Sequence, residues 1–390
     1  MFKPIVILPT NYCNFRCEHC GVKKSEEISY ISPREVERIL KIAKEQGYDM
    51  AVITGGGEPS IDFEKMVKLI KIANSYGLKV RLVTNGSFLL KMNIGQTLKY
   101  LKTCGLTEFC LSYDNFHKRF ISFEFIQNVL KSSIRVGFIT KVMAVTTKDM
   151  KKKTFEELKK IAKNLNGKIF RTSIPFFYID LSSYVILTKK GHFSFTIEEI
   201  QRTDTTIKRF TKDFFRKISL TEIMFHRCCG HVPVLTSDGN ILPCCDFNSL
   251  NNPELYSIAH STEITKKIKI YKHNPILKKI LFDRWAFLKY YAMVRKDKKL
   301  LSEFKDFNFN RSCDFCFLLL KNKEKVSKMK EPSKFEMCLL AVMYFPYLLM
   351  ALLDDLTFRI NDLTFRINER YIGKLGKVLY FAYGRIQPLH

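Results

Sequence analysis

The hydrophobic residues in the first half of the chain form short apolar runs that alternate with amphipathic segments. The runs are rich in β-branched and aromatic side chains, which is typical of buried strands. We predict strands at residues 5–8, 50–54, 79–84, 108–113, 141–146 and 168–174. Between them, apolar side chains recur at helical spacing over residues 35–46, 63–76, 94–103, 123–136 and 154–164. Strands that alternate with helices in this way predict a parallel sheet covered by helices.

The second half of the chain has a less regular pattern. Residues 176–226 are Phe-rich and basic and show no motif. Residues 233–243 predict two short strands around a turn at Asp238 and Gly239. The pattern therefore predicts a small additional region after the sheet.

The C-terminal region pairs a basic segment, residues 321–334, with an uncharged apolar one, residues 337–353. A membrane-spanning helix needs about 20 apolar residues, and Pro346 interrupts this shorter run. We expect a helix that lies in an anionic membrane surface. A buried helix over the mouth of a barrel, or a self-association surface, stays open as an alternative. The repeat at 355–361 and 362–368 is amphipathic both as a helix, which we favour, and as a hairpin.

Composition narrows the class of protein. The 390 residues are 46% apolar and 26% charged, which is typical of a globular chain and excludes a disordered one. The net charge of +27 attracts anions, although solvated Lys-rich helix faces account for it equally well. Cys13 lies too near the first residue for a cleaved signal peptide, so we expect a cytoplasmic protein, peripheral on the inner face of the membrane. Twelve cysteines in a reducing compartment indicate metal or cluster binding more than disulfides.

Three cysteines follow the first predicted strand closely. Cys13, Cys17 and Cys20 have the spacing Cys-x3-Cys-x2-Cys. Three thiolates on one loop can hold three irons of a four-iron cluster and leave the fourth iron open. Zinc is disfavoured because structural zinc needs four ligands and only His19 lies nearby.

Polar or glycine-rich segments also follow later strands. They are Gly55-Gly56-Gly57-Glu58-Pro59, Thr84-Asn85-Gly86 and Leu111-Ser112-Tyr113-Asp114. The carboxyl ends of parallel strands meet at one edge, so we expect these segments to lie near the cysteines.

The four segments, in this order, resemble those of the radical S-adenosylmethionine (radical SAM) enzymes; His19 departs from the pattern by replacing the usual aromatic. The resemblance implies a partial (βα)6 TIM-like barrel over residues 1–180. It implies that Cys13, Cys17 and Cys20 hold a [4Fe-4S] cluster. It also implies that S-adenosylmethionine and substrate lie near Gly56, Gly57, Glu58, Asn85, Ser112 and Asp114. A one-electron reductant such as ferredoxin or flavodoxin is the implied partner.

A second group of cysteines follows. The spacing Cys-x9-Gly-x4-Cys from Cys229 resembles the SPASM or Twitch extension of some radical SAM enzymes. That resemblance implies one auxiliary [4Fe-4S] cluster, with one ligand from Cys228 or Cys229 and one from Cys244 or Cys245. The favoured ligands are Cys228, Cys244, Cys313 and Cys316. A structural zinc site made from the same thiols stays open.

These features predict an α/β chain with three parts. They are a radical SAM core at 1–180, a linker with a small cysteine-rich α+β auxiliary cluster domain at 181–330, and a helical apolar tail at 331–390. The implied activity is reductive cleavage of S-adenosylmethionine and hydrogen abstraction from a peptide, a small molecule or a lipid-linked substrate. The rival hypothesis is a non-catalytic iron–sulfur or zinc protein that binds nucleic acid through its basic surface. It is disfavoured because no nucleic-acid motif is present.

Overall fold

The structure is a computed structural model. It describes residues 3–147 other than 21, 23 and 24, and residues 150–171, 181–199 and 232–242. Farther along it describes 257, 259–264, 289–300 without 291, 292 and 295, and 319–337. The chain divides into two compact units. The described residues of the first unit lie within Met1–Ile200 and Leu235–Gly239, and those of the second within Gln201–Val234 and Asn240–Phe358.

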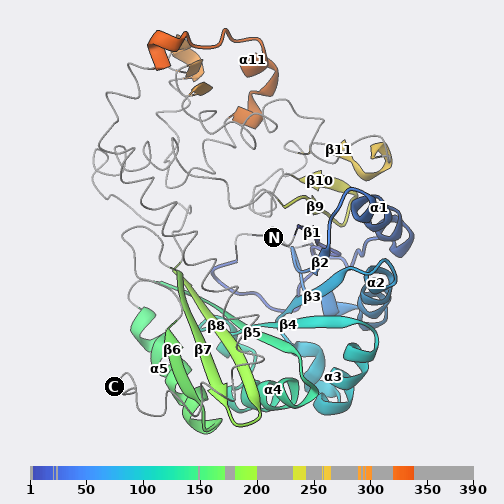
Figure 1. Ribbon diagram of the computed structural model, residues 1–390, viewed down its shortest axis with the longest axis vertical. Coiled ribbons are helices and arrows are strands. Elements are labelled where there is room, and N and C mark those ends of the chain that lie inside the picture. Colours follow the sequence, from blue (N-terminus) through green and yellow to red (C-terminus); the bar gives the residue numbers. More distant parts are fainter. Residues whose placement is uncertain are drawn as a thin grey trace. The chain divides into compact units, whose positions relative to one another are not determined.

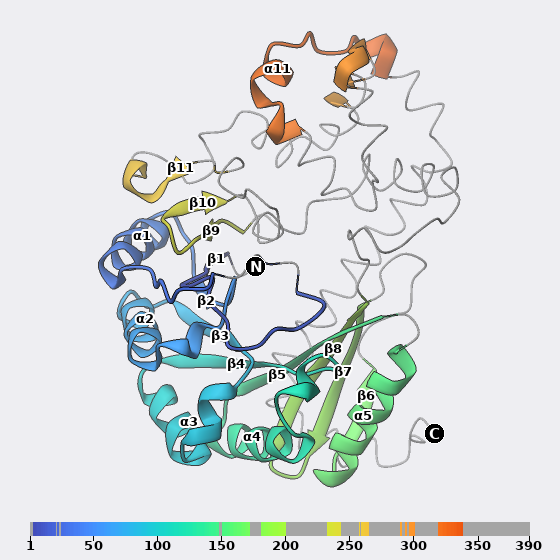
Figure 2. The same ribbon diagram turned by 180° about the vertical axis from the view of Figure 1, so that it is seen from behind.

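The first unit is built on a curved sheet (Figures 1 and 2). Its strands lie in the order β1-β2-β3-β4-β5-β8-β7-β6. The first six strands in this order are parallel, whereas β7 and β6 continue the sheet antiparallel. The bounds are β1 (Pro4–Ile7), β2 (Met50–Ile53), β3 (Lys79–Thr84), β4 (Leu106–Ser112), β5 (Ile139–Thr146), β6 (Lys168–Arg171), β7 (Leu181–Thr188) and β8 (Gly191–Glu199).

Helices cover the outer side of this sheet, as both ribbon views show for α1 to α4. The bounds are α1 (Pro33–Glu45), α2 (Phe63–Ser75), α3 (Ile94–Thr103), α4 (Phe123–Val136) and α5 (Lys151–Asn164). Short 3-10 turns occur at η1 (Pro59–Ile61), η2 (Ser87–Lys91) and η3 (His117–Arg119). The structure therefore confirms the expected partial barrel.

Local sequence explains where the helices begin and end. The side chains of Asp62, Asn93 and Ser122 accept hydrogen bonds from the first turns of α2, α3 and α4, which satisfies backbone donors that a helix start leaves unpaired. Helix α4 ends at Gly137, whose φ of +80° suits glycine. In α1 the buried residues recur on one face, as with Val36, Ile39, Leu40 and Ala43.

The predicted sixth strand exists, but its predicted place in the sheet is wrong. Strand β6 pairs antiparallel with β7, and β8 takes the position parallel to β5. The hairpin of β7 and β8 lies entirely within residues 176–226, for which we predicted no motif. Its signal was the alternation in β8 of buried Phe193, Phe195 and Ile197 with half-buried residues. A hairpin joined by a short turn forms more readily than a long crossover, which explains why β7 and β8 pair.

The turn predicted at Asp238 and Gly239 is present. It lies between β9 (Val234–Leu235) and β10 (Asn240–Leu242), and the Gly239 N–H donates to the Thr236 carbonyl over 3.0 Å. Gly239 has a φ of +84°, a conformation that favours glycine. The Leu8 N–H donates to the Leu235 carbonyl over 2.8 Å, which ties Leu235 to the end of β1.

In the second unit, β10 pairs antiparallel with β11 (Ala259–His260), which leads into η6 (Ser261–Glu263). Farther along, this unit contains α11 (Lys323–Ser327). Among the residues with a described structure, no helix has the length and apolar character needed to cross a bilayer. The predicted apolar segment lies outside the described residues from position 338, and so does the repeat that follows it.

Three charged residues meet on one face of the neighbouring strands β3, β4 and β5. The Glu108 carboxylate lies 2.5 Å from Arg81 Nε and 3.5 Å from Lys141 Nζ, and only 4% of the Glu108 side chain is exposed. Burial by itself would raise the pKa of Glu108, but Lys141 and Arg81 lower it below its ordinary 4.5. The carboxylate is therefore charged and stabilises the fold near neutral pH.

We expect Glu108→Gln to lower the free energy of unfolding by about 3 kcal/mol at pH 7, because two largely buried cations lose their partner. Because the pKa of Glu108 is lower in the folded state, the Glu108 carboxylate contributes its full stabilisation above pH 4.5. This stabilisation is lost as the pH falls through the pKa of the folded state. The difference from wild type should therefore shrink in denaturant titrations below pH 4.5. Glu156→Gln, which breaks an exposed pair with Lys159 on α5, should cost less than about 0.5 kcal/mol. A constant difference from pH 7 to pH 3 would contradict this account.

Candidate functional site

The cysteine loop follows β1 directly. Cys13, Cys17 and Cys20 are half-buried and form no disulfide. The Cys20 N–H donates to the Cys17 carbonyl over 3.1 Å, so the last two cysteines share a tight turn. Phe15, which is 5% exposed, stacks on Phe120 with ring centroids 4.5 Å apart and anchors the middle of the loop. The loop thus offers three accessible thiols from a fixed backbone.

The glycine-rich segment after β2 lies against the cysteine loop. The Gly57 N–H donates to the Thr10 carbonyl over 2.7 Å, and the Glu58 N–H donates to the Tyr12 carbonyl over 2.8 Å. A Cβ on Gly57 would lie 1.9 Å from the Tyr12 oxygen, and one on Gly55 would lie 1.6 Å from the Gly57 oxygen. Glycine is required here because two backbone segments approach more closely than a side chain allows.

The Glu58 carboxylate connects the ends of β2 and β3. It is 3% exposed and accepts the Ser60 N–H over 3.0 Å, the Thr84 hydroxyl over 2.6 Å and the Asn85 N–H over 2.8 Å. The Ser60 hydroxyl donates to it as well. The carboxylate therefore holds the segment after β2 to the end of β3 by hydrogen bonds, a role that the motif alone did not reveal.

Asn85 extends this network to the cysteine loop. Its side-chain Nδ2 donates to Asn14 Oδ1 over 3.1 Å, and Asn14 Nδ2 donates to the Ser87 hydroxyl over 2.8 Å. The Ser87 N–H returns to Asn85 Oδ1 over 2.9 Å. These side chains thus join the cysteine loop after β1 to the segment after β3, which is about 70 residues farther along the sequence.

Asp114 follows β4 and is 2% exposed. Its Oδ1 accepts the N–H groups of Phe116 and His117, and its Oδ2 accepts the Val145 N–H over 3.1 Å. His117 Nδ1 lies 2.8 Å from Asp114 Oδ1. Burial would raise the pKa of Asp114, but the hydrogen bond and charge of His117 lower it.

His117 joins Asp114 to the cysteine loop. Burial would lower the pKa of His117, but hydrogen bonds to Asp114 and to Cys17 raise it to about 9. The ring of His19 packs against Phe116 and His117, with centroid distances of 4.6 and 5.5 Å. His19 therefore occupies the place of the aromatic residue that the motif usually carries.

The family comparison agrees with this geometry. The model of the Radical SAM superfamily matches residues 7–178. This range contains the cysteine loop and the three segments that follow β2, β3 and β4. These residues belong to the radical SAM superfamily. The chain therefore contains a radical SAM domain, and that family uses a [4Fe-4S] cluster with S-adenosylmethionine.

The similar proteins carry names of more than one kind. A putative peptide biosynthesis protein, YydG of Bacillus subtilis, is 24% identical over 83% of this chain and 94% of its own length. A GTP 3',8-cyclase of Vibrio atlanticus is 31% identical, but the match spans 36% of this chain and 45% of the cyclase. A solved structure described as native anSMEcpe with bound AdoMet and Cp18Cys peptide covers 84% of this chain and 98% of that chain, with 14% identity and a TM-score of 0.48.

The radical SAM motif residues in the first half of the chain all follow strands of one sheet. Hydrogen bonds join the cysteine loop to Gly57, Glu58, Asn85 and, through His117, Asp114. Gly56 is buried within the same segment, and Ser112 is the half-buried last residue of β4. Sequence reasoning missed His117, whose one signal was its place three residues after Asp114, the last residue of a segment already singled out.

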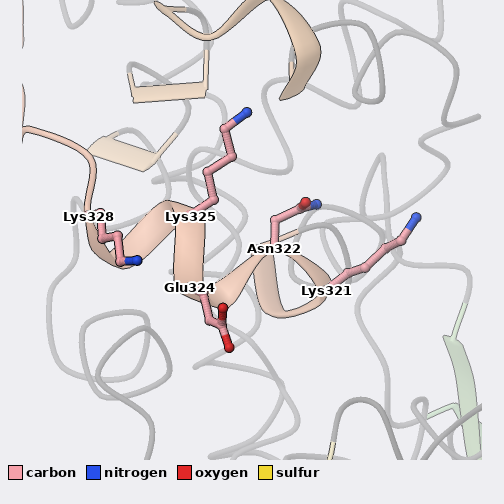
Figure 3. Close-up of a pocket in the computed structure, with 5 residues that line it drawn as sticks. All are labelled: Lys321, Asn322, Glu324, Lys325 and Lys328. Atoms are coloured by element: carbon pink, nitrogen blue, oxygen red, sulfur yellow. The ribbon is translucent and has the colours of Figure 1, made fainter.

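The predicted auxiliary ligands Cys228, Cys244, Cys313 and Cys316 lie outside the described residues. In the second unit, the described part of the chain has a hollow at α11 whose lining is mostly charged (Figure 3). It is lined by Lys321, Asn322, Glu324, Lys325 and Lys328. None of these residues belongs to a predicted site, and the hollow carries no motif of the radical SAM family.

The hydrogen bonds that the Glu58 carboxylate accepts from Ser60, Thr84 and Asn85 lead to a prediction that can be tested without the cofactor. We expect Glu58→Gln to lower the free energy of unfolding of the apoprotein by about 2 kcal/mol, because an amide group must face at least one buried donor. Thermal or denaturant unfolding without S-adenosylmethionine measures this. The exposed Glu26→Gln should stay within about 0.5 kcal/mol of wild type. An apoprotein of unchanged stability would show that Glu58 serves the cofactor alone.

Proposed function

We propose that Cys13, Cys17 and Cys20 hold the [4Fe-4S] cluster at which S-adenosylmethionine is cleaved. The observation that carries this proposal is the loop itself. It offers three half-buried cysteine side chains outside any disulfide at the carboxyl edge of a parallel sheet, with Gly57 and Glu58 hydrogen-bonded to its backbone. Three thiolates suit a four-iron cluster with one iron left for a substrate, so the donor set fits the group.

The chain's own residues position the cofactor. We infer that the backbone of Gly56 and Gly57 receives the methionine end of S-adenosylmethionine, while Glu58 holds that backbone in place from Thr84 and Asn85. Asn85, Ser112 and Asp114 lie at the ends of β3 and β4, on the side where the ribose and substrate would bind. A cluster held by Cys13, Cys17 and Cys20 would supply the electron for reductive cleavage of S-adenosylmethionine to methionine and a 5'-deoxyadenosyl radical, and that radical would take a hydrogen atom from the substrate.

We propose a peptide as the substrate. The support is the relative named as a putative peptide biosynthesis protein, because the similarity extends over 94% of that protein. The match to the cyclase spans only 45% of that protein, so it supports a nucleotide substrate less strongly than the match to the peptide biosynthesis protein supports a peptide. A lipid-linked substrate stays the second candidate because of the basic and apolar segments at 321–353.

Anaerobic reconstitution tests the proposed reaction. The chain is loaded with iron and sulfide, iron is counted, and 5'-deoxyadenosine is measured after dithionite and S-adenosylmethionine are added. We expect 5'-deoxyadenosine to form, and we expect about four irons per chain for each cluster that is bound. A fully loaded chain that forms no 5'-deoxyadenosine would contradict the proposal, and binding of DNA or RNA in low salt would then support the rival function.

The substrate class is tested by comparing a strain that lacks the gene with its parent. We expect the deletion strain to accumulate an unmodified peptide, detected by mass spectrometry, while its lipid extract is unchanged. The purified chain should then convert that peptide and form 5'-deoxyadenosine. A change confined to the lipid extract would overturn the peptide assignment and leave the cleavage reaction intact.

We propose that the second cysteine group holds an auxiliary cluster that accepts the electron of the substrate radical. The support is the sequence spacing of Cys228, Cys244, Cys313 and Cys316. Cys313→Ala should keep 5'-deoxyadenosine formation but lose modified product, and its iron content should fall by about four. Unchanged iron in Cys313→Ala would remove the auxiliary cluster from the mechanism.

A further inference from the structure

A hollow of about 270 Å³, the α4–α5 hollow, lies between the start of α4 and helix α5 in the first unit. Its polar lining consists of Tyr113, Lys118, Ser122, Glu157 and Lys160. Tyr113 continues the pairing of β4 with β5, since its N–H donates to the Met143 carbonyl over 3.0 Å. Successive side chains of a strand point to opposite faces, so Tyr113 points away from the face that carries Ser112. The α4–α5 hollow is therefore separate from the proposed cofactor site.

The hydroxyl of Tyr113 is a buried hydrogen-bond donor at this hollow. Tyr113 is 2% exposed, and its hydroxyl makes no hydrogen bond to any residue that the structure describes. Burial, together with the charge of Asp114, raises the pKa of Tyr113 to about 12, so the hydroxyl keeps its proton near neutral pH. A buried polar group left unpaired costs free energy, and a ligand that accepts this hydrogen bond would recover it.

Two ammonium groups lie in the same lining. Lys118 forms an ion pair with Glu157, and these side chains are 28% and 18% exposed. Lys160 Nζ lies 4.9 Å from the centroid of the Phe123 ring, which places Lys160 beside the start of α4. Burial lowers the pKa of Lys118, and the charges of Lys153 and Lys160 lower it further. Because the lining has two lysines and one glutamate, it keeps an excess of positive charge.

We propose that the α4–α5 hollow binds a small oxyanion, a phosphate or carboxylate group, through the Tyr113 hydroxyl and the ammonium groups of Lys118 and Lys160. Charged acceptor oxygens form strong hydrogen bonds with such donors, and an anion would also reduce the repulsion between the lysines. The oxygen of Ser122 accepts the Phe125 N–H, so the hydrogen of the Ser122 hydroxyl is a further donor. A bound anion would join the connection after β4 to α5.

Calorimetric titration of the full-length chain tests the site. Inorganic phosphate and acetate are the probes, at constant ionic strength and without S-adenosylmethionine. We expect wild type to bind a probe with a Kd of about 1 mM or lower, and Tyr113→Phe to bind it about tenfold more weakly, because a hydrogen bond to a charged group is lost. Binding of phosphate alone would identify a phosphate group, and equal binding of acetate would identify a carboxylate. No binding of either probe to wild type, or equal binding to Tyr113→Phe, would overturn the proposal.

Matched lysine variants separate this hollow from the rest of the basic surface. We expect Lys160→Gln to weaken binding by up to about fivefold. Lys163→Gln should leave binding unchanged, since Lys163 is exposed on the same helix and lies outside the lining. Equal weakening in both variants would show that the anion binds the basic face of α5 in general and would overturn the hollow as the site.

Stability without the anion tests the role of Tyr113 independently. We expect Tyr113→Phe to have a Tm equal to or above that of wild type, because it removes a buried donor that is unpaired among the described residues. Tyr100→Phe is the matched control, since Tyr100 is 44% exposed on α3, and it should change neither Tm nor anion binding. A lower Tm in Tyr113→Phe alone would show that the hydroxyl already has a partner in the fold and would overturn the proposal.

Discussion

Cys17→Ala is expected to abolish cleavage of S-adenosylmethionine, because two thiolates cannot hold a four-iron cluster with a single open iron. The iron count should fall by about four per chain, and 5'-deoxyadenosine should fall to the level without enzyme. The variant also removes the hydrogen-bond partner of His117, so the loop loses its tie to Asp114. Anaerobic iron analysis and chromatography of 5'-deoxyadenosine measure both effects.

The matched control is Cys104→Ala. Cys104 is a free thiol that is 5% exposed at the end of α3, within the core. Its loss should reduce stability by about 1 kcal/mol and leave the iron count and cleavage unchanged. Cleavage at the wild-type rate in Cys17→Ala would show that the loop after β1 is not the cluster site.

Gly57→Ala is expected to displace the glycine-rich segment from the cysteine loop. The new Cβ would lie 1.9, 2.4 and 2.7 Å from three backbone atoms of Tyr12, and backbone atoms cannot move aside as a flexible side chain can. Displacement would break the bonds from the Gly57 and Glu58 N–H groups to the loop. We expect a loss of about 2 kcal/mol in stability and at least a tenfold rise, about 1.4 kcal/mol, in the Kd for S-adenosylmethionine.

Gly95→Ala controls for the substitution itself. Gly95 lies in α3, and the nearest atom to an added Cβ is Asn93 Oδ1 at an ordinary 3.7 Å. Alanine should be neutral or stabilising by up to about 1 kcal/mol there, since it is the better helix former. Equilibrium dialysis with S-adenosylmethionine and denaturant unfolding compare the two variants. Wild-type affinity in Gly57→Ala would remove the glycine-rich segment from the cofactor site.

Much of the fold could be predicted from local pattern. The predicted helices at 94–103 and 123–136 match α3 and α4, and the predicted strand at 79–84 matches β3. These elements have clear apolar periodicity and chemical boundaries, such as the Ser122 cap and Gly137 of α4. Where no such boundary exists the limits shifted, as at α5, which begins at Lys151 and not at 154.

The pairing of the last strands could not be predicted in this way. Periodicity reports which side chains are buried but not which strand lies beside them. The segment at 168–174 was recognised as a strand, but its partner β7 depends on contacts outside the segment. Strand β8 pairs antiparallel with β7 on one side and parallel with β5 on the other, so its place depends on two strands outside its own segment.

The sequence by itself determined the resemblance to the radical SAM family, because the spacing of Cys13, Cys17 and Cys20 and the order of the segments after the strands can be read along the chain. Only the tertiary structure decided what the motif residues do for one another. It showed that Glu58 is held by Thr84 and Asn85, and that His117 lies between Asp114 and Cys17. The physical reason is that hydrogen bonds depend on distances in space, and Cys17 and His117 come together only when the strands of the sheet align.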